Sequence, residues 1–284
     1  MTSAPPRSGA PGVGSRGVAA TLHWWRVVPL LVLVAVLALA VEWWVGLLVL
    51  VVGVAVVALM PRGIEDRILA LLGAELVDDT TQPGVANLVD GLSLSHGVTE
   101  PLLAVVDDPG ANAAVVAGPS HATLVLTTGL LDALDRVELE AVVAQLLARV
   151  RSGHAFLCTR ASWFVCGRGL VRRTPAEGAA GLAALGVGLR GKRLRSLLGA
   201  QVDMRSDLDG VALTRYPPGL RDALVDIAGR GTAVASATWG SSPLWLASPF
   251  PTPQPGHDGA DEEIRTAFDL HDPIQHRIDL LGEL

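Results

Sequence analysis

The feature that most constrains the fold is an apolar run from Val27 to Leu59, interrupted only by Pro29, two glycines and Glu42. As one helix this run would be about 50 Å long, whereas the hydrocarbon core of a bilayer is roughly 30 Å thick. We therefore expect a break at Glu42, with one membrane helix from about Leu22 to Val41 and a second from about Trp44 to Met60. The chain is predicted to begin with a transmembrane helical hairpin.

Aromatic and basic residues predict how this hairpin is oriented. Trp24 and Trp25 would lie at one interface and Trp43 and Trp44 at the other, where indole rings favour the boundary between lipid and water. Arginines flank the hairpin on both outer sides, and the intervening turn has no positive charge: Arg7, Arg16, Arg26, Arg62 and Arg67. The positive-inside rule then predicts a multi-pass cell-membrane protein with both termini cytoplasmic. The alternative is a cleaved signal peptide ending near Ala40, but a second apolar run follows at once.

Three regions are expected along the chain. Residues 1–21 are rich in Ser, Gly, Pro and Ala and predict a disordered tail, residues 22–61 form the membrane anchor, and residues 62–284 form one domain. Within this domain, Gly63 to Val89 has the apolar period of a helix. Three short β-type runs follow, which predict a small antiparallel sheet: Leu102–Val106, Asn112–Val116 and Ala122–Thr127.

The rest of the domain is predicted to be mainly helical, so that the expected fold class is α+β. A helix should begin near Val137 with Asp135 as N-cap and Glu138 in its first turn, and should end before Gly153. Residues 155–200 predict amphipathic helices against the bilayer, because no apolar run there is long enough to span it. Two further helices are expected, one from Gln201 to Arg215, stopped by Pro217-Pro218, and one in the C-terminal stretch DPIQHRIDLLGEL.

Charge and cysteine content exclude some partners. The net charge is −6, and no basic stripe alternates with aromatics, so nucleic acid is not an expected partner. A group of basic residues is predicted either to face anionic lipid or to form a solvated helix surface: Arg168, Arg172, Arg173, Arg190, Arg193 and Arg195. Cys158 and Cys166 have neither metal-type nor redox-type spacing, and a cytoplasmic location predicts free thiols.

Four ordered segments of the chain resemble one protein family. They are DDPGANAAVVAG, HATLVLTTGLLDALDRVELEAVVA, DGVALTRYPPGL and HDPIQHRI. Together with the N-terminal hairpin, they resemble the membrane-anchored HtpX-like and CAAX-prenyl-protease-like zinc metallopeptidases over roughly residues 62–284. The resemblance implies a metallopeptidase domain, a zinc cofactor and an active-site helix at the stretch VELEAVVAQLLARVRSG.

The chemistry of that family depends on H-E-x-x-H, followed about fifty residues later by a Glu four positions before an Asp. Residues at i and i+4 project from one face of a helix, so two histidines can share a Zn²⁺ while the Glu accepts a proton from bound water. The resemblance places these roles on Gln145 for the first His, Leu146 for the Glu and Arg149 for the second His. The third ligand falls on Asp203 and the following Asp on Asp207.

These replacements predict that zinc does not bind and that no general base is present. Gln145 offers a neutral amide, Leu146 has no proton-accepting atom, and the Arg149 guanidinium stays protonated. At about 4 Å and an effective dielectric of 20, a dication next to that charge costs about 8 kcal/mol. We expect Arg149 to pair with Asp203 instead, with Asp207 nearby; the alternative is that Arg149 points to solvent.

Two other features bear on function. The resemblance implies that the edge strand near the Asn-Ala motif binds an extended peptide by strand addition, which makes Asn112, Ala113, Ala114 and Val115 the expected peptide-binding residues unless that edge is covered. The remaining histidines are scattered and predict surface or capping roles, with a rewired metal site as the weaker alternative: His96, His121, His154, His257, His271 and His276.

The sequence therefore predicts a catalytically inactive homologue, a pseudopeptidase, that binds or regulates membrane proteins in quality control. Its expected partners are the membrane, a peptide or membrane-protein substrate, or an active homologue. Two alternatives stay open at this point: an active zinc metalloendopeptidase with a rewired site, and an inert membrane scaffold.

Overall fold

The structure is a computed structural model. It describes residues 63–77, 81–166, 191–199, 202–250 and 269–284, together with Leu33, Val51 and Gly53. These three single residues are helical, but the predicted tail of residues 1–21 and the rest of the predicted hairpin of residues 22–61 lie outside the described residues. Within the described part of the chain, every helix is too short or too polar to cross a bilayer.

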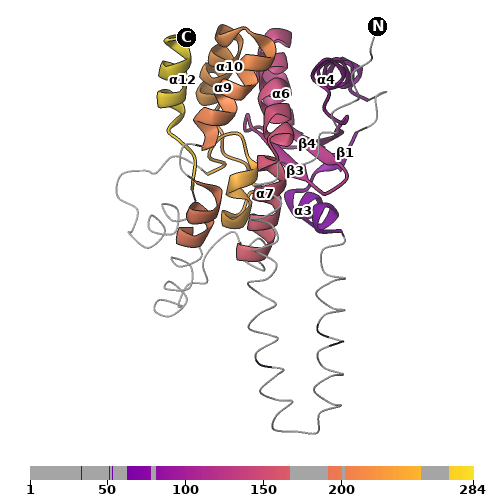
Figure 1. Cartoon of the computed structure of the whole chain (residues 1–284). Coiled ribbons are helices and arrows are strands. Elements are labelled where there is room, and N and C mark those ends of the chain that lie inside the picture. Colours follow the sequence, from indigo (N-terminus) through magenta and orange to yellow (C-terminus); the bar gives the residue numbers. More distant parts are fainter. Residues whose placement is uncertain are drawn as a thin grey trace, which may run out of the picture.

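The domain combines a four-stranded sheet with a larger set of helices, so the α+β class is confirmed (Figure 1). The helices are α3 (Ile64–Leu72), α4 (Pro83–His96), α5 (Thr128–Ala133), α6 (Arg136–Arg151), α7 (His154–Ala161), α9 (Val202–Thr214), α10 (Pro217–Arg230) and α12 (Ile274–Gly282), with a π-helix η1 (Ser162–Cys166) and a 3₁₀-helix η3 (Trp239–Leu244). Residues 191–198 are also helical. The strands are β1 (Glu75–Leu76), β2 (Leu102–Val106), β3 (Ala113–Ala117) and β4 (Ala122–Thr127).

The sheet is mixed, which corrects the predicted antiparallel sheet. Its strand order is β1-β2-β4-β3, and β4 pairs antiparallel with β3 but parallel with β2. The reason is that β3 and β4 form a hairpin, closed by the Gly118 N–H donating to the His121 carbonyl at 2.8 Å, and the hairpin places β4 rather than β3 next to β2. The predicted strand boundaries are otherwise correct to within one residue.

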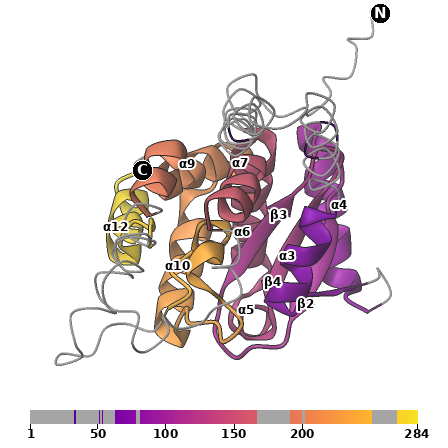
Figure 2. The ribbon, with the colours of Figure 1, turned by 90° about the horizontal axis from the view of Figure 1, so that it is seen from below.

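Both faces of the sheet are buried at β3 and β4, which explains why these two strands are apolar without alternation. Ala113, Val115 and Ala117 pack in one core cluster together with residues of α4, α6 and α10. Ala114 and Val116 pack in a second cluster together with residues of α3, α7 and η1. In two views the helix α6 lies between the sheet on one side and α9 and α10 on the other (Figures 1 and 2).

The predicted helical stretch from Gly63 to Val89 is two helices with β1 between them. Helix α3 ends at Gly73, whose φ of 68° is the left-handed conformation that glycine adopts most readily at a helix C-terminus. Helix α4 begins at Pro83, where the missing N–H costs nothing. The apolar period therefore predicted helical structure here, but the single stretch ending at Val89 was wrong: Gly73 ends the first helix, and α4 continues to His96.

The helix α6 follows the predicted course. The Asp135 side chain accepts hydrogen bonds from the N–H groups of Val137 and Glu138, and the Glu138 Oε2 accepts one from the Asp135 N–H at 2.8 Å. This capping box satisfies N–H groups that a helix start would otherwise leave unpaired. Gly153, with φ of 77°, separates α6 from α7.

The prolines after α9 have a different role from the one predicted. Helix α9 already ends at Thr214, and Arg215 takes a left-handed φ of 56°. Pro217 then lies at the first positions of α10, so it starts a helix rather than stopping one. The predicted closing helix is present as α12, which packs against α10 (Figure 1).

Candidate functional site

The predicted site positions meet where α6 packs on α9. The two backbones approach so closely that a Cβ atom added at Gly210 would lie 2.7 Å from the Cα atom of Gln145. On α9, Asp203 and Asp207 are one turn apart, and both are almost completely buried. The fold therefore brings the helix of Gln145 and Arg149 against the helix of Asp203 and Asp207, as the resemblance implied.

The first two motif positions, Gln145 and Leu146, hold no ionisable group. The Gln145 Nε2 donates to the Asp207 Oδ1 at 3.3 Å, while its Oε1 is buried without a hydrogen-bond partner in the described structure. Leu146 is 0 % exposed and belongs to the core cluster of α4, α6 and α10. A carbon side chain in a hydrophobic core cannot accept a proton from water.

Arg149 does not form the predicted ion pair with Asp203. Its guanidinium, 1 % exposed, donates to three main-chain carbonyls of one segment: Pro243 at 2.6 Å, Trp245 at 2.9 Å and Leu244 at 3.4 Å. The Arg149 charge still helps to lower the pKa of Asp203. The carbonyl oxygens accept from both terminal nitrogens of the guanidinium, while its Nε is buried without a hydrogen-bond partner in the described structure.

Asp203 instead pairs with His271, for which the sequence predicted a surface or capping role. The Asp203 Oδ2 lies 2.8 Å from the His271 Nδ1 and also accepts the Asp272 N–H at 3.2 Å. The His271 Nε2 lies 2.9 Å from the Ser242 carbonyl oxygen. A carbonyl and an ionised carboxylate can only accept, so both ring nitrogens donate and His271 is an imidazolium.

The pKa shifts of this pair agree with the geometry. Burial lowers the pKa of His271, but the Asp203 carboxylate, the Asp269 charge and the hydrogen bond to the Ser242 carbonyl together raise it by more, so that the net shift is upward. Burial raises the pKa of Asp203, and the charges of His271, Arg277 and Arg149 more than offset that effect, so its pKa is well below the usual range. Both groups are therefore charged near neutral pH.

Asp207 is held by a bidentate ion pair. The Nε and Nη2 atoms of Arg277 donate to its two carboxylate oxygens, each at 2.7 Å, and the Nη1 donates to the Leu246 carbonyl at 2.7 Å. Neither side chain is more than 1 % exposed. Two carboxylates of α9 are thus each neutralised by a cationic side chain from residues 269–284.

His154 and Cys158 complete the surroundings of Arg149. The His154 ring lies about 3.5 Å from the Cys158 Sγ. Burial and the Arg149 charge lower the pKa of His154 to about 3, and burial raises the pKa of Cys158 to about 11. At neutral pH the imidazole is uncharged and the thiol is protonated, so the thiol is not a ready nucleophile.

The predicted peptide-binding edge is covered by the chain itself. Asn112, Ala113, Ala114 and Val115 are all 0 % exposed. β3 is the last strand of the sheet, but Ala114 pairs antiparallel with Trp245, and the Leu246 N–H donates to the Ala113 carbonyl at 2.6 Å. The segment 245–247 occupies the position of an added strand, which corrects the prediction of an open edge at these four residues.

Asn112 has a structural role in this arrangement. Its Nδ2 donates to the Thr232 carbonyl at 2.9 Å and to the Ala247 carbonyl at 3.0 Å, while its Oδ1 accepts the N–H groups of Ala113 and Ala247. The side chain thereby fixes the start of β3 to two other segments. All of its hydrogen-bonding groups are used within the protein.

The residues at this site do not match the ligands of a zinc ion. Zinc sites use histidine, cysteinate and carboxylate ligands. Here a guanidinium and an amide stand on α6, and both carboxylates of α9 are already bound by cations. Across the described residues there is no group of three or more His, Cys, Asp or Glu side chains placed to hold a metal ion.

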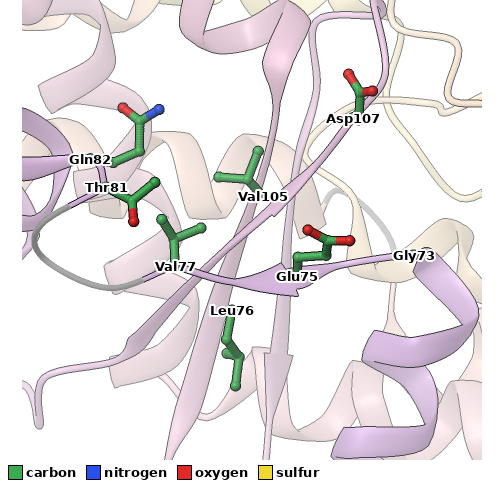
Figure 3. Close-up of a pocket in the computed structure, with 8 residues that line it drawn as sticks. All are labelled: Gly73, Glu75, Leu76, Val77, Thr81, Gln82, Val105 and Asp107. Carbon is green, nitrogen blue, oxygen red and sulfur yellow. The ribbon is translucent and has the colours of Figure 1, made fainter.

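A groove lies elsewhere, beside the short strand β1. It measures about 380 Å³ and is lined by residues of β1, β2 and the approach to α4 (Figure 3): Gly73, Glu75, Leu76, Val77, Thr81, Gln82, Val105 and Asp107. None of the residues singled out from the sequence lies in it. The sheet separates β1 from β3, so this groove and the α6–α9 site are at opposite edges.

The helix pair α6–α9 brings the motif positions together, and α6 packs on β3, the last strand of the sheet. The chain is 31 % identical over 214 residues to the protease HtpX homologue of Dictyoglomus turgidum, covering 69 % of this chain and 67 % of that protein. It is 28 % identical over 237 residues to the homologue of Tropheryma whipplei (75 % and 76 % covered) and 27 % identical over 262 residues to that of Ligilactobacillus salivarius (84 % and 85 %).

The chain belongs to the HtpX-like family of membrane metallopeptidases, which confirms the resemblance stated from its motifs. No family profile matches it. Sequence reasoning missed two residues of the site, His271 and Arg277. Both residues belong to the stretch HDPIQHRI, one of the four segments that resemble the family, and they are six positions apart in it. That resemblance could have indicated them as site residues.

Proposed function

We propose that this protein is a membrane-anchored, non-catalytic member of the HtpX family that acts by binding or regulating other proteins in membrane quality control. The observation that carries the proposal is Arg149. Its guanidinium stands on α6 at the position where the resemblance implies a metal ligand, and three main-chain carbonyls fix it there. A fixed positive charge at this point opposes a dication.

The neighbouring positions support the same conclusion. Hydrolysis at a zinc site needs a metal-bound water and a group that accepts its proton. Leu146 provides no such group, and Asp203 and Asp207 are engaged by His271 and Arg277. The buried charges therefore serve to hold α9 and the C-terminal segment together rather than to bind a metal.

The experiment is a set of matched variants of the full chain, purified in detergent, with zinc content and casein cleavage as readouts. We expect neither zinc nor cleavage for the natural sequence, and both for a triple variant with Gln145→His, Leu146→Glu and Arg149→His. A double variant with Gln145→His and Leu146→Glu keeps the guanidinium, and we expect it to stay without zinc. Circular dichroism of each variant shows whether it is folded. About one zinc per natural chain, with cleavage, would refute the proposal.

A second candidate function is that of a structural scaffold without peptide binding, and the covered edge of β3 favours it. Strand addition needs free main-chain groups, and residues 245–247 already pair with that edge. The two functions differ in one test: a binding protein captures unfolded membrane proteins or an active homologue from membranes, whereas a scaffold does not. Cross-linking of the full chain in native membranes distinguishes them.

A further inference from the structure

One surface of the domain carries a concentration of positive charge. Residues 191–198 form a helix in which Lys192, Arg193 and Arg195 are exposed, while Leu194 and Leu198 are buried. The two leucines pack in the core cluster of α3, α7 and η1. The apolar side of this helix therefore faces the domain, and its basic side faces outward.

The start of α3 and the end of α7 lie at the same end of the domain, opposite the C-terminus (Figure 1). There the exposed Arg67 places its guanidinium carbon 5.9 Å from the ring centre of the half-buried Trp163. Basic side chains next to an indole ring are typical of the layer where lipid headgroups meet water. Asp66, also exposed, offsets one of the positive charges.

The chain itself limits how far this end can lie from the membrane. The second predicted membrane helix ends near Met60, and α3 begins at Ile64. Four residues span at most about 14 Å when fully extended. This distance is comparable with the Debye length of about 8–10 Å at physiological ionic strength. The electrostatic attraction between charges at this end of the domain and a charged membrane surface is therefore only partly screened.

We propose that Arg67, Lys192, Arg193 and Arg195 form a lipid-facing surface that binds anionic phospholipid headgroups and holds the domain against the membrane. The inference rests on the membrane anchor of the proposed function. Each basic side chain at an anionic surface increases association about fivefold, so the three on residues 191–198 together change the balance between the docked and undocked domain by about 100-fold. The partner is the lipid surface and not a second protein.

The test uses the full chain in nanodiscs with a fluorophore on Ser196→Cys, an exposed position of the same helix, in a Cys166→Ser background; Cys158 is buried. A quencher attached to lipid headgroups reports contact. We expect strong quenching in discs with about a third phosphatidylglycerol and weak quenching in pure phosphatidylcholine. A label on Glu283→Cys, at the opposite end of the domain, should be unquenched in both.

Two variants with equal loss of charge test the surface itself. Lys192→Gln, Arg193→Gln and Arg195→Gln together should abolish the response to phosphatidylglycerol, whereas Arg136→Gln, Arg221→Gln and Arg230→Gln should keep it. Equal quenching with and without phosphatidylglycerol, or equal loss in both variants, would overturn the inference while leaving the anchor intact. A chain that does not enter nanodiscs would refute the anchor and this inference together.

Discussion

Replacing Arg149 by Met tests whether the guanidinium stabilises the fold. Methionine keeps an unbranched apolar stem of similar length but removes all the donors. Two of the three hydrogen bonds, to Pro243 at 2.6 Å and to Trp245 at 2.9 Å, have good lengths, while the one to Leu244 at 3.4 Å is long. Hydrogen bonds to a charged group contribute about 1.5–3 kcal/mol each, so the loss should be about 3–6 kcal/mol.

Part of this loss is offset, because the variant no longer buries a charge. We therefore expect a destabilisation near the lower end, about 3 kcal/mol, which lowers Tm by about 10 °C in a domain of this size. Near-ultraviolet circular dichroism of the full chain during heating measures the transition. Arg151→Met is the control, since Arg151 lies on the same helix but is exposed, and its Tm should change little.

The outcome that refutes the reasoning is a Tm of Arg149→Met within about 1 °C of the natural sequence. The carbonyls of Pro243, Leu244 and Trp245 would then need no donor from α6. The assignment of Arg149 as a structural replacement for a metal ligand would lose its physical basis, even if the protein bound no zinc.

Two further predictions follow from the packing and charge of the site. Gly210→Ala should destabilise the domain by about 1–3 kcal/mol, because its Cβ would meet the backbone of Gln145, whereas Gly229→Ala, with open space around it, should not; urea unfolding measures both. The pKa of His271 is higher in the folded protein, so its pairing with Asp203 stabilises the fold below about pH 6.5, and this stability is lost as pH rises through the raised pKa. The difference in urea midpoint between the natural sequence and His271→Gln should therefore shrink as pH rises above about 6.5, whereas His154, whose pKa is lowered, affects both proteins alike; a difference that stays constant with pH would contradict the assignment.

Local features of the sequence predicted local structure well. The capping box of Asp135 and Glu138 depends on residues three positions apart, and the apolar period of α6 repeats within one helix, so both were visible without the fold. The strand boundaries were correct for the same reason. The parallel pairing of β2 with β4 was not predicted, because it depends on where the β3–β4 hairpin folds, and no short stretch of sequence specifies that position.

The partners of the site residues show the same limit. A buried guanidinium needs acceptors, and the sequence predicted a carboxylate because carboxylates are visible in it. The acceptors of Arg149 are main-chain carbonyls about ninety-five positions away. Because every residue has a main-chain carbonyl, no residue type in the sequence indicates which carbonyls these are. The Asp203 carboxylate pairs with His271, which lies sixty-eight positions further along the chain.

The two ion pairs of α9 also make the end of the chain indispensable. Chain termini usually tolerate trimming, tags and fusions because little depends on them. Here the loss of residues 269–284 would remove His271 and Arg277, the cationic partners of Asp203 and Asp207. Two buried carboxylates would then have no ion-pair partner. A stop codon before residue 269 would therefore prevent stable folding of the domain, although it leaves every described helix and strand before α12 in the chain.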